Sequence, residues 1–358
     1  MKRIRNSLIT VIGFSWCFLA LSTQAQESDP QKLLWNSVHK LDVVGVKTAL
    51  DKGANPNWVS DPRPKYGMSV IYHLAGAHSW SKDEKAHEKS VEILLMLFKA
   101  GAKLQHYCDQ DILYWPVYEG WEDFTEILLR NGANPTKPIN RETPMEIAVA
   151  KDRTNIINLL KKHGVPELEH RVAAQIIFIE AATRGDTGRM EEAIQNGAHV
   201  NGSNSKGETA LIMTVFYQIF GISQYNSVEY LLKKGANPNV EGDSPFSYKT
   251  TALHTVISSS SFTFGREIKE GYLKDAPTYA RMIIESLLRH GAHVSARDGY
   301  GRTPLHIAAE RNNIVGAKML IEAGAKIMPR DNEGKTPLDY AESGEMIKLL
   351  KAHGAKEE

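Results

Sequence analysis

The 358-residue sequence is poor in cysteine, in net charge, and in tryptophan beyond its first third. Its only cysteines are Cys17 and Cys108, so at most one internal disulfide could form. The 43 basic and 42 acidic side chains nearly cancel and leave a formal net charge of +1. A nearly neutral chain lacks the basic surface that binds nucleic acid or an anionic membrane, and we expect neither as a partner.

Sequence signatures of catalysis are missing as well. The chain has no Gly-x-Ser-x-Gly turn for a nucleophilic serine, no glycine-rich loop for a phosphate, and no His-Glu-x-x-His pair for zinc. His73 with His78, and His87 with Glu88, lack the spacing of metal ligands. We therefore expect no cofactor and no metal, and interpret the chain as non-enzymatic. Chemistry in the segment 258–280 is the weaker alternative.

The first 25 residues, 1–25, have the layout of a secretory signal. Basic residues within positions 2–5 precede an apolar run over 8–21, and Ala25 suits a cleavage site. The run is short for a membrane span, although a retained membrane anchor is the alternative. The layout indicates a bacterial protein that is periplasmic or secreted, with no membrane attachment after cleavage.

Removal of this signal would leave a single cysteine, Cys108, and a formal charge of −2. No internal disulfide is then available in an oxidising compartment, so a long continuous apolar core must supply the stability. We interpret Cys108 as a partly buried structural residue. A reactive thiol is the alternative, but no basic cluster flanks the cysteine to activate it.

A short phrase does recur along the chain: the end of an apolar helix, then Gly-Ala, then a polar turn. Its glycines are Gly53, Gly101, Gly132, Gly197, Gly235, Gly291, Gly324 and Gly354, with a degenerate copy at Gly164. Five of the eight steps between neighbouring glycines measure 30 to 33 residues. A repeat of this period predicts a solenoid of small units that bury their apolar faces against one another.

The clearest unit shows how the repeats are built. Thr303 can cap a first helix, and Pro304 suits its first turn because the missing N–H has no helical partner there anyway. A narrow apolar stripe over 305–309 continues this helix. A second helix carries the apolar residues of 315–320, and Gly324 ends it as a left-handed cap.

Residues 303–308 read Thr-Pro-Leu-His-Ile-Ala and resemble the ankyrin repeat, whose Thr-Pro-Leu-His-x-Ala signature they match. Weaker copies begin at Thr143, Thr209, Thr251 and Thr336, and Ser69 holds the same place in an earlier unit. The resemblance implies an all-α solenoid of about nine helix-turn-helix units with β-turn fingers, over about 31–355. It also implies that His254 and His306 hydrogen-bond between neighbouring units.

Two units without Thr-Pro resemble opening repeats, at 33–53 and at 178–197. A second opening repeat in mid-chain indicates two stacked blocks. After the signal we therefore predict block one over 26–164, with about four repeats, and block two over 165–358, with about five. The sequence leaves open whether the blocks form one superhelix or hinge. Pro116 falls inside an expected first helix, which should be short or kinked.

In ankyrin repeats the turn before the Thr-Pro site and the end of the first helix line a concave binding surface. Alignment of the units places aromatic residues there: Tyr66, Tyr107, Tyr118, Phe216, Tyr217, Tyr248 and Tyr300. Trp58 and Trp80 join these candidates because they fall in a turn and an insertion, whereas Trp35 and Trp121 should pack between helices. Such rings offer a large rigid contact area, so we predict that they bind protein. For any single ring, filling a gap between imperfect repeats is the alternative.

Three units carry extra residues between their two expected helices, and the larger insertions lie at 76–90 and 258–280. The first is polar and charged, and the second opens with a serine run over 258–261. Insertions in repeat proteins form loops on one face and often carry function. Neutral drift is the alternative, because long surface loops cost little stability.

These features together predict an exported, monomeric protein-binding scaffold whose partner is another protein. A sharper hypothesis makes it a periplasmic inhibitor or immunity protein that acts on a toxin or a cell-wall enzyme. A secreted effector that binds host proteins is the alternative. An immunity protein should be encoded beside its toxin, whereas an effector should be found outside the cell and be dispensable in pure culture.

Overall fold

The computed structural model describes residues 29–356, except for 62–66, 81–84, 107, 140, 218–221, 245–246 and 265–275. Within this part of the chain, eighteen α-helices follow one another as nine pairs. The expected signal segment 1–25 lies outside the described residues. Among the helices that are described, none is both long and apolar enough to cross a membrane.

The first helices of the pairs are α2 Pro30–His39, α4 Val70–Trp80, α6 Tyr114–Glu119, α8 Pro144–Ala150, α10 His170–Arg184, α12 Ala210–Tyr217, α14 Ala252–Phe264, α16 Pro304–Glu310 and α18 Pro337–Tyr340. The second helices are α3 Val43–Asp51, α5 Ala86–Lys99, α7 Glu122–Arg130, α9 Thr154–Lys162, α11 Thr187–Gln195, α13 Ile222–Lys233, α15 Ala276–Arg289, α17 Ile314–Glu322 and α19 Gly344–Ala352. A 3₁₀ turn, η1, spans Cys108–Asp111.

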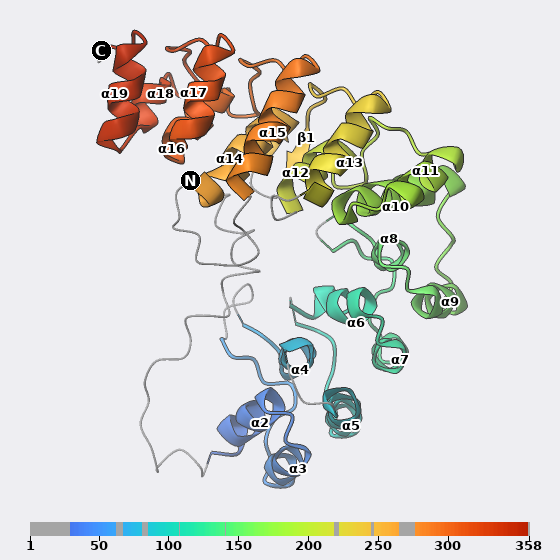
Figure 1. Ribbon diagram of the computed structural model, residues 1–358. Coiled ribbons are helices and arrows are strands. Elements are labelled where there is room, and N and C mark those ends of the chain that lie inside the picture. The colour runs from blue at the N-terminus through green and yellow to red at the C-terminus, as the bar shows by residue number, and fades with distance from the viewer. Residues whose placement is uncertain are drawn as a thin grey trace. The chain divides into compact units, whose positions relative to one another are not determined.

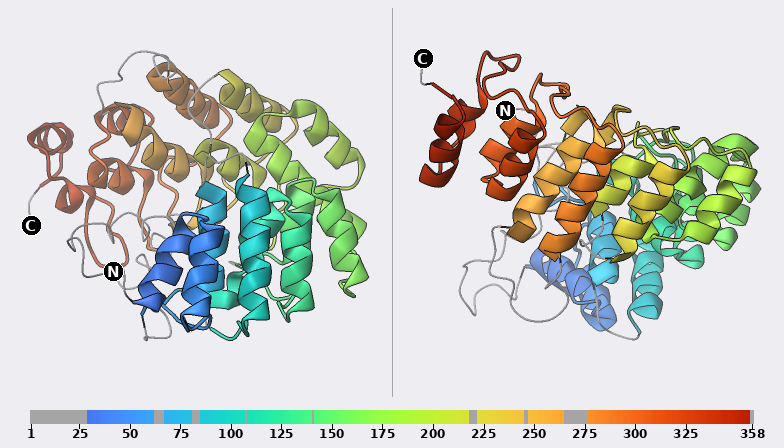
Figure 2. Two further views of the ribbon diagram at one scale, coloured as in Figure 1. Left: turned by 90° about the horizontal axis from the view of Figure 1, so that it is seen from below. Right: turned by 45° about the horizontal axis from the view of Figure 1, so that its top comes forward.

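The chain forms two compact units that divide between Glu169 and His170. In the N-terminal unit, α2, α4, α6 and α8 contact one another in order, and α3, α5, α7 and α9 form a second row (Figure 2, left). In the C-terminal unit, the first helices α10 to α18 make the corresponding row (Figure 1). Each unit has its own apolar core, between Leu34 and Val165 in one and between Ala174 and Ala355 in the other. Stacking of helix pairs is what buries these side chains, as the repeat period predicts.

The helices begin and end as the sequence predicts. Thr143 Oγ1 accepts the N–H of Glu146 at 3.2 Å, and Glu146 Oε2 accepts the N–H of Thr143 at 2.6 Å. Both bonds satisfy N–H groups that have no partner inside α8. Pro304 and Pro337 stand in the first turns of α16 and α18. Gly324 follows α17 with a φ of +87°, the left-handed conformation expected of a helix cap.

Buried histidines join neighbouring pairs in the C-terminal unit. Nδ1 of His306 accepts the N–H of Thr303 at 2.9 Å, so the ring proton resides on Nε2. That nitrogen donates to the carbonyl of Lys335 in the next pair, at 3.1 Å. Nε2 of His254 lies 3.1 Å from the carbonyl oxygen of Arg302 in the same arrangement. The predicted structural role of both histidines is therefore confirmed.

Asparagine side chains make a second set of bonds between pairs, which we did not predict. Asn57 donates to the carbonyl of Gly101 at 2.9 Å and accepts the N–H of Lys103 at 2.8 Å. Asn201 donates to Gly235 at 3.1 Å and accepts from Asn237 at 2.7 Å. The amides thereby satisfy backbone groups just after the second helix of the following pair.

The two large insertions begin as helix rather than as loop, which corrects the expectation for their first residues. α14 has 13 residues against 7 in α16, and it includes the serine run 258–261. Residues 76–80 likewise extend α4. Neither stretch contains proline, and His78 stacks on Trp121 with ring centroids 3.5 Å apart, which holds the added turn against α7. The remainders, 81–84 and 265–275, lie outside the described residues.

Two further details qualify the predicted fold. The fold is not strictly all-α, because β1 Gly242–Ser244 pairs antiparallel with β2 Ser247–Thr250 before α14. Such a hairpin is what a β-turn finger requires. α6 contains Pro116 and has six residues, so the prediction of a short first helix there is confirmed.

Candidate protein-binding face of the C-terminal unit

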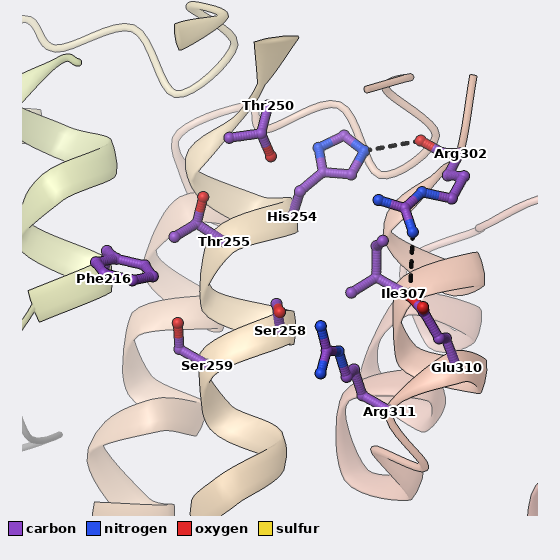
Figure 3. A pocket seen from close by; sticks show the side chains of 10 residues that line it. All are labelled: Phe216, Thr250, His254, Thr255, Ser258, Ser259, Arg302, Ile307, Glu310 and Arg311. Carbon is purple, nitrogen blue, oxygen red and sulfur yellow. Dashed lines mark hydrogen bonds and ion pairs between the residues drawn. The ribbon is translucent and has the colours of Figure 1, made fainter. Parts of the chain in front are cut away.

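One cavity of the C-terminal unit lies among the first helices α12, α14 and α16 (Figure 3). It is lined by Ile307 and Glu310 of α16 and by Arg311, which follows that helix directly. The remaining lining residues come from α12, α14 and the turns before α14 and α16: Phe216, Thr250, His254, Thr255, Ser258, Ser259 and Arg302. Its volume is about 30 Å³, room for roughly two water molecules. Sites for cofactors and small substrates are typically about ten times larger or more.

Arg302 is held in place by two carboxylates. Its guanidinium contacts Asp298 Oδ2 through Nε at 3.0 Å and Nη2 at 2.9 Å, and it contacts Glu310 Oε2 through Nη1 at 3.1 Å. The ring of Tyr300 lies under the same guanidinium, 5.0 Å from its carbon to the ring centroid. The Asp298 side chain is 1% exposed and that of Arg302 15%, so this ion pair is shielded from water.

His254 is a neutral group at the back of this cavity. Burial lowers its pKa, and the nearby carboxylate of Asp298 opposes the shift only in part. Nδ1 lies 2.8 Å from Thr251 Oγ1, and Nε2 is committed to the carbonyl of Arg302. Since both ring nitrogens are already used, His254 builds the wall of the cavity and does not offer a proton to a ligand.

Arg311 differs from Arg302 in having no carboxylate. It is exposed at the end of α16, and its guanidinium makes no hydrogen bond or ion pair with the described residues. Figure 3 shows it extending towards Ser258 of α14, while Glu310 turns to Arg302. The hydroxyl of Ser259 also belongs to the cavity lining, on the side of α14 nearer Phe216 in Figure 3, and is likewise without a partner in the part of the chain that the structure describes. The cavity thus presents one uncompensated cation beside hydroxyl groups.

Two of the aromatic residues predicted to bind protein belong to this face. Phe216 is half-buried in the wall of the cavity, and Tyr300 is 42% exposed against Arg302. The side chains of Tyr217 and Tyr248 lie outside the described residues. The structure therefore places Phe216 in the wall of the cavity and Tyr300 against Arg302, another of the lining residues.

The other predicted binding residues belong to the N-terminal unit. Trp58 is half-buried, with its ring edge-on to Trp35 at 5.4 Å between centroids, and it packs against the core of that unit. Tyr118 stacks on Tyr114 at 5.8 Å, with the ammonium of Lys151 4.7 Å above its ring. Tyr66 and Tyr107, and the side chain of Trp80, lie outside the described residues. Trp35 and Trp121 pack against the core, as predicted.

An open hollow of about 530 Å³ marks the N-terminal unit beside α5 and α7, lined in part by His87, Trp121 and Asp123. Nε2 of His87 lies 2.8 Å from Asp123 Oδ1. Glu126, also on its wall, pairs with Arg130 and Lys162. Among the described residues, no group of three His, Cys, Asp or Glu side chains is placed to hold a metal ion.

Sequence reasoning missed Arg311 and gave Ser258 and Ser259 no specific role. Both serines were visible as part of a serine run, and Arg311 stands where each first helix ends. The predicted binding surface consists of aromatic residues alone, and Arg311 and the two serines are polar. The isolation of Arg311 from carboxylates depends on which helix lies beside it, and the sequence carries no direct signal for that.

Comparisons with known proteins agree with the predicted resemblance. Residues 278–358 match the family model for ankyrin repeats, in three copies. The chain is 30% identical over 194 residues to human mitochondrial disaggregase, across 50% of this chain and 26% of that protein. It is 26% identical over 189 residues to a putative ankyrin repeat protein of Acanthamoeba polyphaga mimivirus, across 50% of this chain and 42% of the relative. The chain thus covers less than half the length of either relative, and the matches show ankyrin repeats in it.

Proposed function

We propose that all nine helix pairs are ankyrin repeats, and that the chain is an exported, non-enzymatic scaffold that binds another protein. The family model matches the pairs within residues 278–358. Outside that range, the capping box of Thr143 and the amide bridges of Asn57 and Asn201 repeat the same construction, which supports extending the family to both units. Ankyrin stacks expose a continuous face that commonly binds proteins.

One observation carries the binding role: an exposed, unpaired cation and a half-buried aromatic ring line the same cavity on the α12–α14–α16 face. Arg311 and Phe216 line the same cavity. An isolated guanidinium and an aromatic side chain are both enriched among the residues that dominate protein interfaces. The small cavity volume fits a side chain of a partner better than a free small molecule.

The compartment and the partner are also part of the proposal. The signal-like segment 1–25 supports export to the periplasm. There we propose that the chain acts as a monomeric inhibitor or immunity protein, with a toxin or a cell-wall enzyme as its partner. Cell fractionation of the tagged full chain tests export, because a cytoplasmic protein that retains residues 1–25 would contradict it.

Affinity capture from periplasmic extract tests the binding role. The mature chain is the bait, and the variant carries Arg311→Ala together with Tyr300→Ala. We expect one specific partner, recovered at least tenfold less well by the variant. Val44→Ala is the control, because Val44 is 74% exposed on α3, a second helix. The proposal fails if no partner is specific to the bait, or if the double variant captures it as well as the control does.

A further inference from the structure

We propose that the cavity between α12, α14 and α16 receives an acidic side chain of the partner protein. The carboxylate would lie on the guanidinium of Arg311, in the cavity that Ser259 also lines. This inference rests on the proposed binding function and identifies the chemistry of the contact.

The charged side chains at the cavity indicate which kind of partner side chain it binds. The Arg302 guanidinium is engaged by two carboxylates, those of Asp298 and Glu310, whereas Arg311 has none among the described residues. Within this group of four charges, Arg311 is therefore the cation whose partner is missing. An arginine fork binds a carboxylate through two parallel N–H donors, which makes an Asp or Glu side chain the matching group.

The acidic residues at the cavity are both paired with Arg302. Glu310 is the only carboxylate among the lining residues, and it is directed to Nη1 of Arg302 at 3.1 Å. Asp298 has a side chain that is 1% exposed, and it pairs with the same arginine. A basic side chain, by contrast, would meet Arg311 at close range with no free anion to offset it. The cavity therefore discriminates against Lys and Arg.

The size and walls of the cavity fit the end of one side chain. A volume of about 30 Å³ accommodates roughly two waters, and a carboxylate entering it would displace them. Ile307 and the ring of Phe216 supply apolar contacts for the methylene groups that precede the carboxylate. Partial removal from water strengthens a charge-assisted hydrogen bond relative to one on an open surface.

The serine run acquires a role in this arrangement. The insertion in this repeat lengthens α14, and the serine run 258–261 begins at the last position that α14 shares with α16 and continues into the added turn. Ser258 and Ser259 line the cavity, while Ser260 is buried and accepts a hydrogen bond from Asn313 Nδ2 at 2.9 Å. Because the buried serine fixes the rotation of α14, Ser258 and Ser259 are held in the wall of the cavity.

A selection with a phage-displayed library of random twelve-residue peptides tests the proposal. The full mature chain is compared with Arg311→Gln, and with Arg281→Gln as a control of equal charge change on α15. We expect peptides selected on wild type and on the control to carry Asp or Glu at one position, several times above the library frequency. Arg311→Gln should lose this preference. Circular dichroism checks that this exposed substitution leaves the fold intact.

A double-mutant cycle then assigns the contact. Replacing the selected peptide's acid by its amide should weaken binding to wild type roughly 10- to 100-fold, and should have little effect on Arg311→Gln. Peptides without an acidic preference, an acid dependence that survives in Arg311→Gln, or no selected peptide would each overturn the proposal. If a periplasmic partner is nevertheless captured equally by wild type and Arg311→Gln, the scaffold function stands and only this contact is wrong. Absence of any captured partner would instead remove the proposed function.

Discussion

Asn239 and Gly291 are joined by a hydrogen bond that spans 52 residues of sequence: the side-chain Nδ2 donates to the glycine carbonyl at 2.8 Å. Oδ1 of the same amide accepts the N–H of His293 at 2.7 Å. A single side chain therefore supplies a donor and an acceptor to the loop that follows α15. The bond ties adjacent helix pairs at a point where the backbone groups of the last helical turn have no helical partner.

We expect Asn239→Ala to destabilise the C-terminal unit by about 1 kcal/mol, because two hydrogen bonds are lost but water can reach the exposed groups left behind. Ser295→Ala is the matched control. Ser295 stands at the same place in the next pair, but its Oγ is 3.5 Å from the N–H of Lys326, a weak contact. Urea unfolding followed by circular dichroism measures both. Equal midpoints for Asn239→Ala and wild type would show that the bridge contributes nothing.

His73 links the stability of the N-terminal unit to pH. Its ring lies flat on Trp35, 3.8 Å between centroids, and next to the ring of His39 at 5.3 Å. It is 6% exposed, and neither ring nitrogen has a hydrogen-bond partner in the described chain. Burial, assisted by His39, lowers the pKa of His73 from 6.5 to about 4.

Between pH 6.5 and about 4 the unfolded chain binds a proton at His73 that the folded chain does not. The stability contributed by neutral His73 is therefore complete above pH 6.5 and is lost as the pH falls, by up to about 1.4 kcal/mol per pH unit. His73→Phe should keep the stack on Trp35 and flatten this part of the pH profile. Urea unfolding at pH 7, 6 and 5 tests it. An unchanged slope in the variant would contradict the assignment to His73.

Asn313 is the buried N-cap of α17. Its Oδ1 accepts the N–H of Gly316 at 2.8 Å, while Nδ2 donates to the carbonyl of Ile257 and to Ser260 Oγ, both at 2.9 Å. We expect Asn313→Ala to cost roughly 2–4 kcal/mol, because it removes a cap and leaves the buried acceptors on α14 unsatisfied. Asp186→Ala is the control: it removes the cap of α11 at an exposed position and should cost only about 1 kcal/mol.

The variant Asn313→Asp separates the two roles of Asn313. The carboxylate can still accept the N–H of Gly316, but it cannot donate to α14 when ionised, and its charge is buried. We expect it to be strongly destabilised at pH 7 and partly rescued as the pH falls and the acid becomes protonated. If Asn313→Asp is as stable as wild type at pH 7, the hydrogen bonds from the Asn313 amide to α14 do not contribute to stability.

Two left-handed glycines should respond differently to alanine. Gly324 has a φ of +87° and open space around it, so Gly324→Ala should cost about 1 kcal/mol from backbone strain alone. Gly301 has a φ of +76°, and an added Cβ would lie 2.9 Å from the backbone nitrogen of Asn332. Gly301→Ala should therefore cost roughly 2–4 kcal/mol. Thermal unfolding of the two variants shows which one loses more stability. Equal losses would show that the backbone at Asn332 moves aside for the added Cβ at no cost.

The local elements follow from local rules, and these were predictable. Thr143 and Glu146 form a capping box because they are three residues apart at a helix start. Gly324 ends α17 because only glycine takes that backbone conformation without strain. Pro116 limits how far α6 can extend towards the N-terminus, because proline is tolerated only in the first turn of a helix. Each of these depends on neighbours within one turn, so a single sequence is sufficient.

The length of α14 was not predictable in the same way. The segment after Ile257 is polar and rich in serine, a composition typical of loops. It is helical because Asn313, 56 residues further on, donates to the Ile257 carbonyl and to Ser260. The stacking of His73 was not predictable for the same reason, because it depends on Trp35 in the preceding helix pair.

The sequence by itself determined the period, the helix caps and the apolar stripes, because these arise from interactions between residues close along the chain. Only the tertiary structure decided which polar side chains meet across pairs. Arg302 pairs with Asp298 and Glu310, whereas Arg311, the residue after Glu310, pairs with no carboxylate among the described residues. The two arginines differ because the helix rotation and the extended α14 set what lies opposite each one. Those features arise from contacts between separate repeats.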